Sequence, residues 1–327
     1  MRPSSFLFQL AILIAGFALI NMGVRFAARR APAHKLVSAI DNQRYTISTT
    51  PVTDISLGNS LVEVGLLPKV FNQVRNERNV FQLALGGTKP IENYATLRYY
   101  FDNLPPKTPL PRTLIYGFYD RQLTDASLRD WDDVSGNFAI VYYTNIENTL
   151  PFYASKDNWR TWRYRLSAPF PVITDRGQVW SAVEKMRRQV SRIGLTKEAT
   201  NAFGRIEDMG ALEPDVPQFE RACLREARAG APLSPAMDAI MQLCAQYKMR
   251  VVFVKMPMSS FHRRTYYSTA IWHQYETQLR ATAKSYGAAY IDASDWIDDT
   301  KFSDHVHLLK PGAVPFTRRL AATPELS

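Results

Sequence analysis

The chain has 327 residues, of which 46% are hydrophobic. This length suits one large domain or two small ones, and the apolar content is ample for a buried core, which excludes a disordered protein. With 40 basic and 30 acidic residues the formal charge is +10 at pH 7. That balance suits an anionic membrane surface or glycan, and a solvated basic surface explains it equally well. No zinc spacing, Walker loop or RNA-binding signature occurs, so we expect no metal, no cofactor and no nucleic-acid partner.

The first feature in chain order is an apolar run from Pro3 to Val24 that holds no charged residue. As a helix it is long enough to cross the roughly 30 Å hydrocarbon layer of a membrane. Three arginines between positions 25 and 30 crowd the small residues at which a signal peptide would be cut. We therefore expect residues 1–30 to be an uncleaved transmembrane anchor, with residues 31–50 as a stalk.

The side of the membrane on which the domain lies is not decided by charge or by cysteine. The basic residues after the span favour a cytoplasmic domain, but this bias weakens when a long domain follows. Cys223 and Cys244 could pair in an oxidising compartment, and two buried thiols are an equal alternative.

Short apolar runs separated by helix-sized segments follow the stalk. The runs that we predict as strands lie at residues 54–57, 79–85, 113–118, 138–143, 250–257 and 289–292. Helical patterns lie between them, and Pro311-Gly312 opens a last helix. Strands that alternate with helices in this way predict a parallel α/β sheet, whose ligands bind beyond the carboxyl ends of the strands.

Residues 145–248 fit this alternation poorly. They hold a tryptophan and arginine cluster at 159–165 and an amphipathic pattern at 179–190. We predict a largely helical insertion that caps a site or rests on a membrane surface. The cluster could bind a glycan or a lipid headgroup, although packing and surface charge explain it more simply.

Three polar features have the residue types of acyl-transfer chemistry. Ser60 follows the first strand at a turn into a helix, a position that holds a nucleophile near helix amides, although a lone Gly-x-Ser is more often a helix cap. The Gly86-Gly87 pair ends the second strand and lets a backbone N–H approach a ligand, with an ordinary tight turn as the alternative. Asp304 and His307 form an acid/base unit, which needs a hydroxyl or thiol from elsewhere.

Three short blocks occur in order, at Gly58–Leu61, Leu83–Thr88 and Asp304–Leu308. They resemble the blocks of the SGNH or GDSL-type hydrolase superfamily, which are Gly-Asp-Ser-Leu, a second block with an oxyanion glycine, and Asp-x-x-His-Leu.

The flanks at Leu57–Gly65 and Lys310–Gly312 are similar to a membrane-anchored branch of that superfamily, around the alginate acetylation proteins and the teichoic-acid D-alanyl transfer proteins. The resemblance covers about residues 51–143 and 249–322 and leaves the insertion unmatched.

The resemblance implies a role for each matching residue. Ser60 would be the nucleophile, His307 the general base, and Asp304 the group that orients the imidazole. The oxyanion would be held by the backbone N–H groups of Ser60 and Gly87, with Gly86 as the second choice.

The histidines other than His307 fit that role less well. His305 is next to Asp304 in the sequence, which suits the family's base poorly. His262 and His273 are typical of surface or packed histidines.

The chain departs from the family at two positions. Asn59 stands where the family often has aspartate, which the chemistry tolerates because that side chain accepts no acyl group. Gly117-Phe118-Tyr119-Asp120 stands where the family places Gly-x-Asn-Asp, so the asparagine that donates to the oxyanion is replaced by Tyr119. The Tyr119 hydroxyl could donate instead, or its ring could simply line the cleft.

The resemblance implies a three-layer α/β/α sandwich with a parallel, flavodoxin-like sheet over residues 51–327, interrupted by the helical insertion. It implies a serine O-acyltransferase or esterase that acts on acyl groups of a cell-envelope polysaccharide from the outer side of a bacterial inner membrane. Its partners would be the membrane, the polysaccharide or acyl donor, and a membrane-bound acyltransferase or other envelope proteins. The alternatives are a plain carbohydrate or lipid esterase and a non-catalytic scaffold in an envelope polysaccharide machine.

Overall fold

The structure of this chain is a computed structural model, which describes residues 3–29, 32–43, 51–76, 78–127, 140–154, 158–175 and 215–326. The chain divides into two compact units. One takes in residues 1–42 and 128–196, and the other takes in residues 43–127 and 197–327, with the sheet and every candidate site residue. The amphipathic pattern at residues 179–190 lies outside the described residues.

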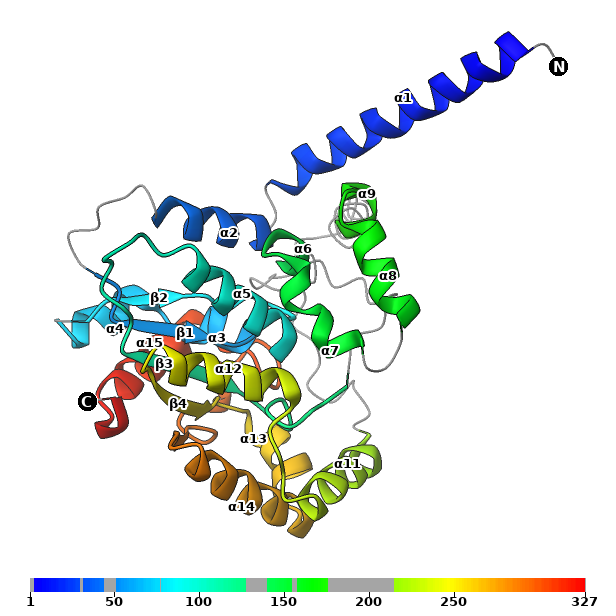
Figure 1. The fold of residues 1–327 in the computed structure, drawn as a ribbon. Helices are drawn as coiled ribbons and strands as arrows, with labels where there is room; N and C mark the ends of the chain where they lie inside the picture. Colours follow the sequence, from blue (N-terminus) through cyan, green and yellow to red (C-terminus); the bar gives the residue numbers. More distant parts are fainter. Residues whose placement is uncertain are drawn as a thin grey trace, which may run out of the picture. The chain divides into compact units, whose positions relative to one another are not determined.

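The sheet has parallel strands in the order β2-β1-β3-β4-β5 (Figure 1). The strands are β1 (Asp54–Leu57), β2 (Val80–Gln82), β3 (Thr113–Phe118), β4 (Arg250–Lys255) and β5 (Ala289–Asp292). All 6 residues of the central strand β3 are buried, as expected of a parallel strand that is covered on both faces. The predicted α/β class with a parallel sheet is confirmed, and the strand order is the flavodoxin-like one.

Helices cover both faces of this sheet. In the sheet unit they are α3 (Ser60–Gly65), α4 (Pro68–Val74), α5 (Pro90–Asp102), α11 (Val216–Arg228), α12 (Pro235–Gln246), α13 (Ser260–His262), α14 (Ala270–Ser285) and α15 (Lys310–Ala321), with short turns η3 (Arg263–Tyr267), η4 (Asp299–Lys301) and η5 (Pro324–Leu326). Helices α5 and α12 pack side by side on one face, and α3, α4 and α15 pack together on the other (Figure 1). Because the strands are parallel, the loops that follow them meet at one edge of the sheet.

The last helix is bonded to the first helices of the sheet unit. On α15, the Thr317 hydroxyl donates to the Gly65 carbonyl at 3.0 Å and accepts from the Leu67 N–H at 3.0 Å. Arg75, at the end of α4, donates to the Thr323 carbonyl at 2.9 Å, just beyond α15. These bonds hold the α15 end of the chain against the segment that follows β1.

Gly117 in β3 lets α3 approach the sheet closely. A Cβ at this position would lie 2.2 Å from Val62 Cγ2 and 2.8 Å from Met256 Sδ. A side chain there would therefore displace α3, the helix that begins with Ser60.

The second unit is helical in its described part. It contains α1 (Pro3–Ala28), α2 (Pro32–Gln43), α6 (Ile140–Tyr143), η2 (Ile146–Asn148), α7 (Leu150–Ala154), α8 (Asn158–Ser167) and α9 (Pro171–Thr174). Within α1, the segment Phe6–Ala28 has a mean hydropathy of 2.1 and is long and apolar enough to cross a membrane.

The described part of the segment between residues 145 and 248 is helical, as predicted. Its helices α11 and α12 belong to the sheet unit, where α12 contacts β4 and α5.

The prediction of a strand at residues 138–143 is wrong for the residues that the structure describes, because Ile140–Tyr143 forms the helix α6. Thr144 N–H donates to the Ile140 carbonyl at 3.0 Å, a helical bond. A short apolar run has no period that separates a buried strand from a buried helical turn. The described part of this run belongs to the helical unit and is not one of the strands of the sheet.

Candidate active site

Ser60 is the first residue of α3, directly after the turn that ends β1. Asn59 caps the helix, because its Oδ1 accepts the Leu61 N–H at 2.9 Å. The Ser60 hydroxyl therefore lies at the carboxyl edge of the sheet, and the N–H groups of Val62 and Glu63 in the same turn donate to the Asn59 carbonyl at 3.1 and 3.0 Å. Its Oγ is 2.8 Å from His307 Nε2.

His307 and Asp304 lie in the loop between η4 and α15. Asp304 Oδ2 accepts from His307 Nδ1 at 2.6 Å, and its Oδ1 accepts the N–H groups of Val306 at 2.8 Å and His307 at 2.7 Å. Burial alone would raise the pKa of Asp304, but the hydrogen bonds from the His307 ring and from the two amides outweigh it and lower the pKa to about 2. The carboxylate is therefore ionised at neutral pH and keeps the hydrogen of the neutral ring on Nδ1.

The structure thus brings Ser60, His307 and Asp304 into one chain of hydrogen bonds. An imidazole whose Nδ1–H is held by a carboxylate can accept the proton of a hydroxyl at Nε2. His305 is oriented differently, since its ring is parallel to the ring of His262 with centroids 5.6 Å apart.

The two candidate oxyanion glycines differ in their surroundings. Gly86 N–H donates to Glu63 Oε2 at 2.7 Å, so this amide is already used by a carboxylate on α3. Burial raises the pKa of Glu63, and the Gly86 hydrogen bond partly offsets that rise. Gly87 has φ +70, a left-handed conformation that glycine adopts without strain.

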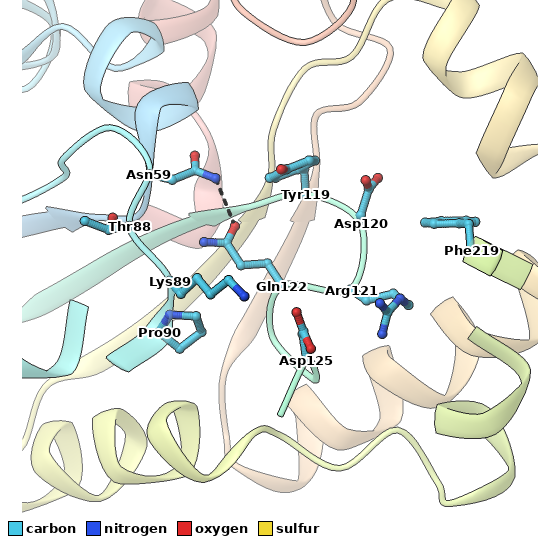
Figure 2. Close-up of a pocket in the computed structure, with 10 residues that line it drawn as sticks. All are labelled: Asn59, Thr88, Lys89, Pro90, Tyr119, Asp120, Arg121, Gln122, Asp125 and Phe219. Carbon is cyan, nitrogen blue, oxygen red and sulfur yellow. Dashed lines mark hydrogen bonds between the residues drawn. The ribbon is translucent and has the colours of Figure 1, made fainter. Parts of the chain in front are cut away.

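Tyr119 and Asn59, the residue before Ser60, both line a pocket with a volume of about 240 Å³ (Figure 2). The other lining residues are Thr88, Lys89, Pro90, Asp120, Arg121, Gln122, Asp125 and Phe219. Burial raises the pKa of Tyr119 to about 12, so its hydroxyl keeps its proton and can donate a hydrogen bond. Tyr119 therefore lines this pocket with a protonated hydroxyl.

Gln122 is a residue of this pocket that the sequence did not indicate. Its Oε1 accepts from Asn59 Nδ2 at 3.4 Å (Figure 2). Its Nε2 is buried and has no hydrogen-bond partner among the residues that the structure describes. A buried donor without an acceptor typically costs about 1–3 kcal/mol, so an acceptor atom of a bound ligand would be stabilised there.

Asp120 and His262 form a second acid/base pair that was also not predicted. Asp120 has φ 48, and its Oδ1 accepts from His262 Nε2 at 2.8 Å and from the Tyr267 hydroxyl at 2.7 Å. The His262 side chain is 3% exposed, so it is a packed histidine, and its ring contacts that of His305. The pair links the loop after β3 to α13, and the contact between the rings of His262 and His305 extends to the loop that carries His307. The one sequence signal for it was the place of Asp120 directly after a predicted strand.

Within the described ranges, no group of three or more His, Cys, Asp or Glu side chains could hold a metal ion. Cys223 and Cys244 are buried free thiols.

Comparisons with known proteins place few limits on this site. No protein-family model matches the chain, and no curated protein matches it. Among solved structures, the chain is similar to one described as "a putative platelet activating factor from Streptococcus pneumonia". The two are 9% identical, the match covers 96% of each chain, and the TM-score is 0.39. A likeness at this level carries no argument about function.

Proposed function

We propose that this chain is a membrane-anchored, SGNH-like serine enzyme that transfers or hydrolyses acyl groups through an acyl-Ser60 intermediate. The observation that carries the proposal is the hydrogen-bonded chain from Ser60 Oγ to His307 Nε2, at 2.8 Å, and from His307 Nδ1 to Asp304 Oδ2, at 2.6 Å. A serine that only capped a helix would not need an imidazole held by a carboxylate.

The chemistry follows from which atom holds each proton. Ser60 Oγ attacks the acyl carbonyl carbon while its proton passes to His307 Nε2, and the imidazolium that forms is stabilised by Asp304. The tetrahedral intermediate collapses, and Nε2 returns the proton to the leaving oxygen. A second hydroxyl, from water or from a sugar, then gives its proton to Nε2 and attacks the acyl carbon. As the bond from the acyl carbon to Ser60 Oγ breaks, Nε2 returns this proton to Oγ and the free serine is restored.

The developing oxyanion needs donors near Ser60. The backbone N–H groups of Ser60 and Gly87 are proposed for this role. Gly86 is omitted, because its N–H donates to Glu63. The third donor, asparagine in the family, would be replaced by the buried Gln122 amide or by the Tyr119 hydroxyl. A missing donor typically costs about 100-fold or more in rate.

Two features favour an acyl group of a cell-envelope polysaccharide over a soluble ester. The apolar helix α1 would tether the site at a membrane, where envelope polymers are assembled, and the flanks of the blocks resemble those of the envelope acylation branch. The domain would then lie on the outer side of the inner membrane, with the polysaccharide or acyl donor and other envelope proteins as partners. A reporter fused after residue 327 that is active only in the cytoplasm would overturn this location.

The covalent intermediate can be tested on the full chain in detergent. The purified protein is treated with an activated acyl ester, and intact mass is followed with time. We expect a mass increase of one acyl group, mapped to the peptide of Ser60, that is lost in both Ser60→Ala and His307→Ala. Ser268→Ala, at an exposed serine on another loop, is the matched control and should acylate normally. No adduct in the wild-type chain with any acyl donor would refute the enzymatic proposal and favour a scaffold.

Transfer and hydrolysis are separated by a competition experiment. Oligosaccharide is added to the acylated protein, and acylated sugar and free acid are both measured. Transfer predicts that the sugar takes the acyl group at the expense of water. Release of free acid alone would mean a plain esterase.

A further inference from the structure

Helix α8 presents an exposed apolar face. Trp159 is 63% exposed, Trp162 is 57% exposed and Leu166 is 58% exposed, and their spacing places all three on one side of the helix. Tyr164, on the opposite side, is 0% exposed. Single exposed apolar residues are ordinary, but two tryptophans and a leucine on one face indicate a surface that binds a membrane or another molecule.

The neighbouring helix α9 packs against the apolar helix α1. Val172 N–H, in α9, donates to the side chain of Asn21 at 3.1 Å. Just before α9, the ring of Phe170 lies on the ring of Phe17, with centroids 5.5 Å apart. Both partners on α1 belong to the segment that can cross a membrane.

These contacts define how far α9 lies below the membrane surface if α1 spans the membrane. The first charged residue after the apolar run is Arg25, four residues beyond Asn21 and eight beyond Phe17. At a rise of 1.5 Å per residue, the two contacts lie about 6 and 12 Å along α1 from the level at which charge begins. Helices that lie in a membrane interface bury their apolar face about 5–10 Å into the boundary between headgroups and acyl chains. If α1 crosses the bilayer, the Asn21 contact lies within this depth and the Phe17 contact about 2 Å below it, so α9 lies at the inner boundary of an interface.

The direction and charge of α8 fit the same position. In Figure 1, α8 extends from α9 across the direction of α1 rather than along it. Arg163 and Arg165 flank the apolar face on its two sides, and Arg165 donates to Glu147 at 2.8 Å and 3.0 Å. Tryptophan on an apolar face with arginine at its borders is the composition of a helix in a membrane interface, where the ring lies at headgroup level and the charge reaches water.

We propose that α8 and α9 form an interfacial membrane-binding element. The face made by Trp159, Trp162 and Leu166 lies among the headgroups and outer acyl segments of a phospholipid bilayer, on the side where α1 ends. The helical unit is then attached to the membrane at two places, the spanning helix and this element beside it. The proposal does not depend on the chemistry at Ser60.

The test places a fluorescent label on the face in the full chain, reconstituted in phospholipid vesicles. The variants Leu166→Cys and Trp162→Cys are labelled separately with an environment-sensitive thiol dye. The native thiols give little background, because Cys223 and Cys244 are buried and burial raises the pKa of each to about 12. The unsubstituted chain measures that background, and Thr277→Cys, at an exposed position on α14, is the matched control.

We expect the emission of both α8 labels to shift to shorter wavelength in vesicles. Lipids with a nitroxide near the headgroup end of the acyl chain should quench them more than lipids with a nitroxide near the chain terminus. The Thr277→Cys label should keep its emission in water. Two labelled positions are used so that a local folding defect in one variant is detected by the other and by its thermal unfolding.

Three results would overturn the proposal. Emission typical of water at both positions would mean that the face is solvated. Shifted emission without quenching by any nitroxide lipid would mean that protein or glycan covers the face. Strongest quenching at the bilayer centre would mean that α8 lies deeper than an interface.

Discussion

Replacing Asp304 with asparagine tests the proposed acid/base unit with the smallest change of shape. Asp304 Oδ1 accepts two backbone N–H groups, and Oδ2 accepts from His307 Nδ1. An asparagine can keep its oxygen toward the two amides, which then turns its NH₂ group toward His307. The ring must respond by carrying its hydrogen on Nε2, where it can no longer accept the proton of Ser60.

The expected loss is large for catalysis and small for stability. A wrong tautomer in a Ser-His-Asp arrangement costs about 10⁴-fold in kcat, or about 5 kcal/mol in the barrier. For stability, the pKa of Asp304 falls from 3.8 to about 2 on folding, which is roughly 2 kcal/mol at 1.36 kcal/mol per unit. We expect Asp304→Asn to lower the unfolding free energy by about 1 kcal/mol, because solvent partly screens the carboxylate.

The unfolding free energy should depend on pH in a definite direction, because folding lowers the pKa of Asp304. The stabilisation by ionised Asp304 is present above the unfolded value, which is about 3.9, and it is lost as pH falls through about 2. The difference in unfolding free energy between wild type and Asp304→Asn should therefore be constant near neutral pH and shrink below about pH 4.

The assay is the rate of release from an activated acyl ester by the full chain, together with denaturant unfolding. Asp298→Asn is the matched control, since Asp298 also accepts a backbone N–H, from Thr300 at 2.9 Å. A loss of less than about 10-fold in Asp304→Asn, with the fold intact, would refute the role given to the Asp304 carboxylate.

Three further predictions concern other parts of the sheet unit. Gly117→Ala should lower the unfolding free energy by about 1–3 kcal/mol in a denaturant titration, because its Cβ would overlap Val62; unchanged stability would contradict the close packing of α3 on β3. Gln122→Glu removes the buried amide donor and should lower kcat for the activated ester by about 100-fold, whereas a rate within about 3-fold of wild type would exclude that donor from the reaction. Lys255→Ala should destabilise the fold by about 1–3 kcal/mol, since it removes the ammonium 2.9 Å from the part-buried Glu276 carboxylate and leaves Arg280, at 3.0 Å, as its remaining cation; stability equal to wild type would contradict a stabilising role for the buried ammonium.

The bounds of a strand could be predicted from the sequence where the strand coincides with an apolar run. The predicted bounds of β1, β3 and β5 match those observed. For β1 and β3 this is because parallel strands covered on both faces form apolar runs closed by turn residues. β2 (Val80–Gln82) is shorter than predicted, although Leu83 and Leu85 beyond it still donate their N–H groups to the Ser56 and Gly58 carbonyls. The strand predicted at residues 138–143 was not found, because a short apolar segment can form a buried helical turn as well as a buried strand.

The site could be predicted in part. The order of the blocks indicated that Ser60 and His307 should meet, and the structure has them 2.8 Å apart. The Asp120 and His262 pair could not be predicted, since it depends on how two loops approach each other in space. The same is true of the Gln122 amide, whose orientation is set by contacts that no local pattern encodes.

The bonds between α15 and the segment after β1 have a consequence for the order of events in synthesis. Ser60 leaves the ribosome long before His307, 247 positions later in the chain. By the proposed mechanism, a chain that has not yet made His307 would have no base for Ser60. The bond from Thr317 to the Gly65 carbonyl would then mark the stage at which the serine becomes reactive toward esters.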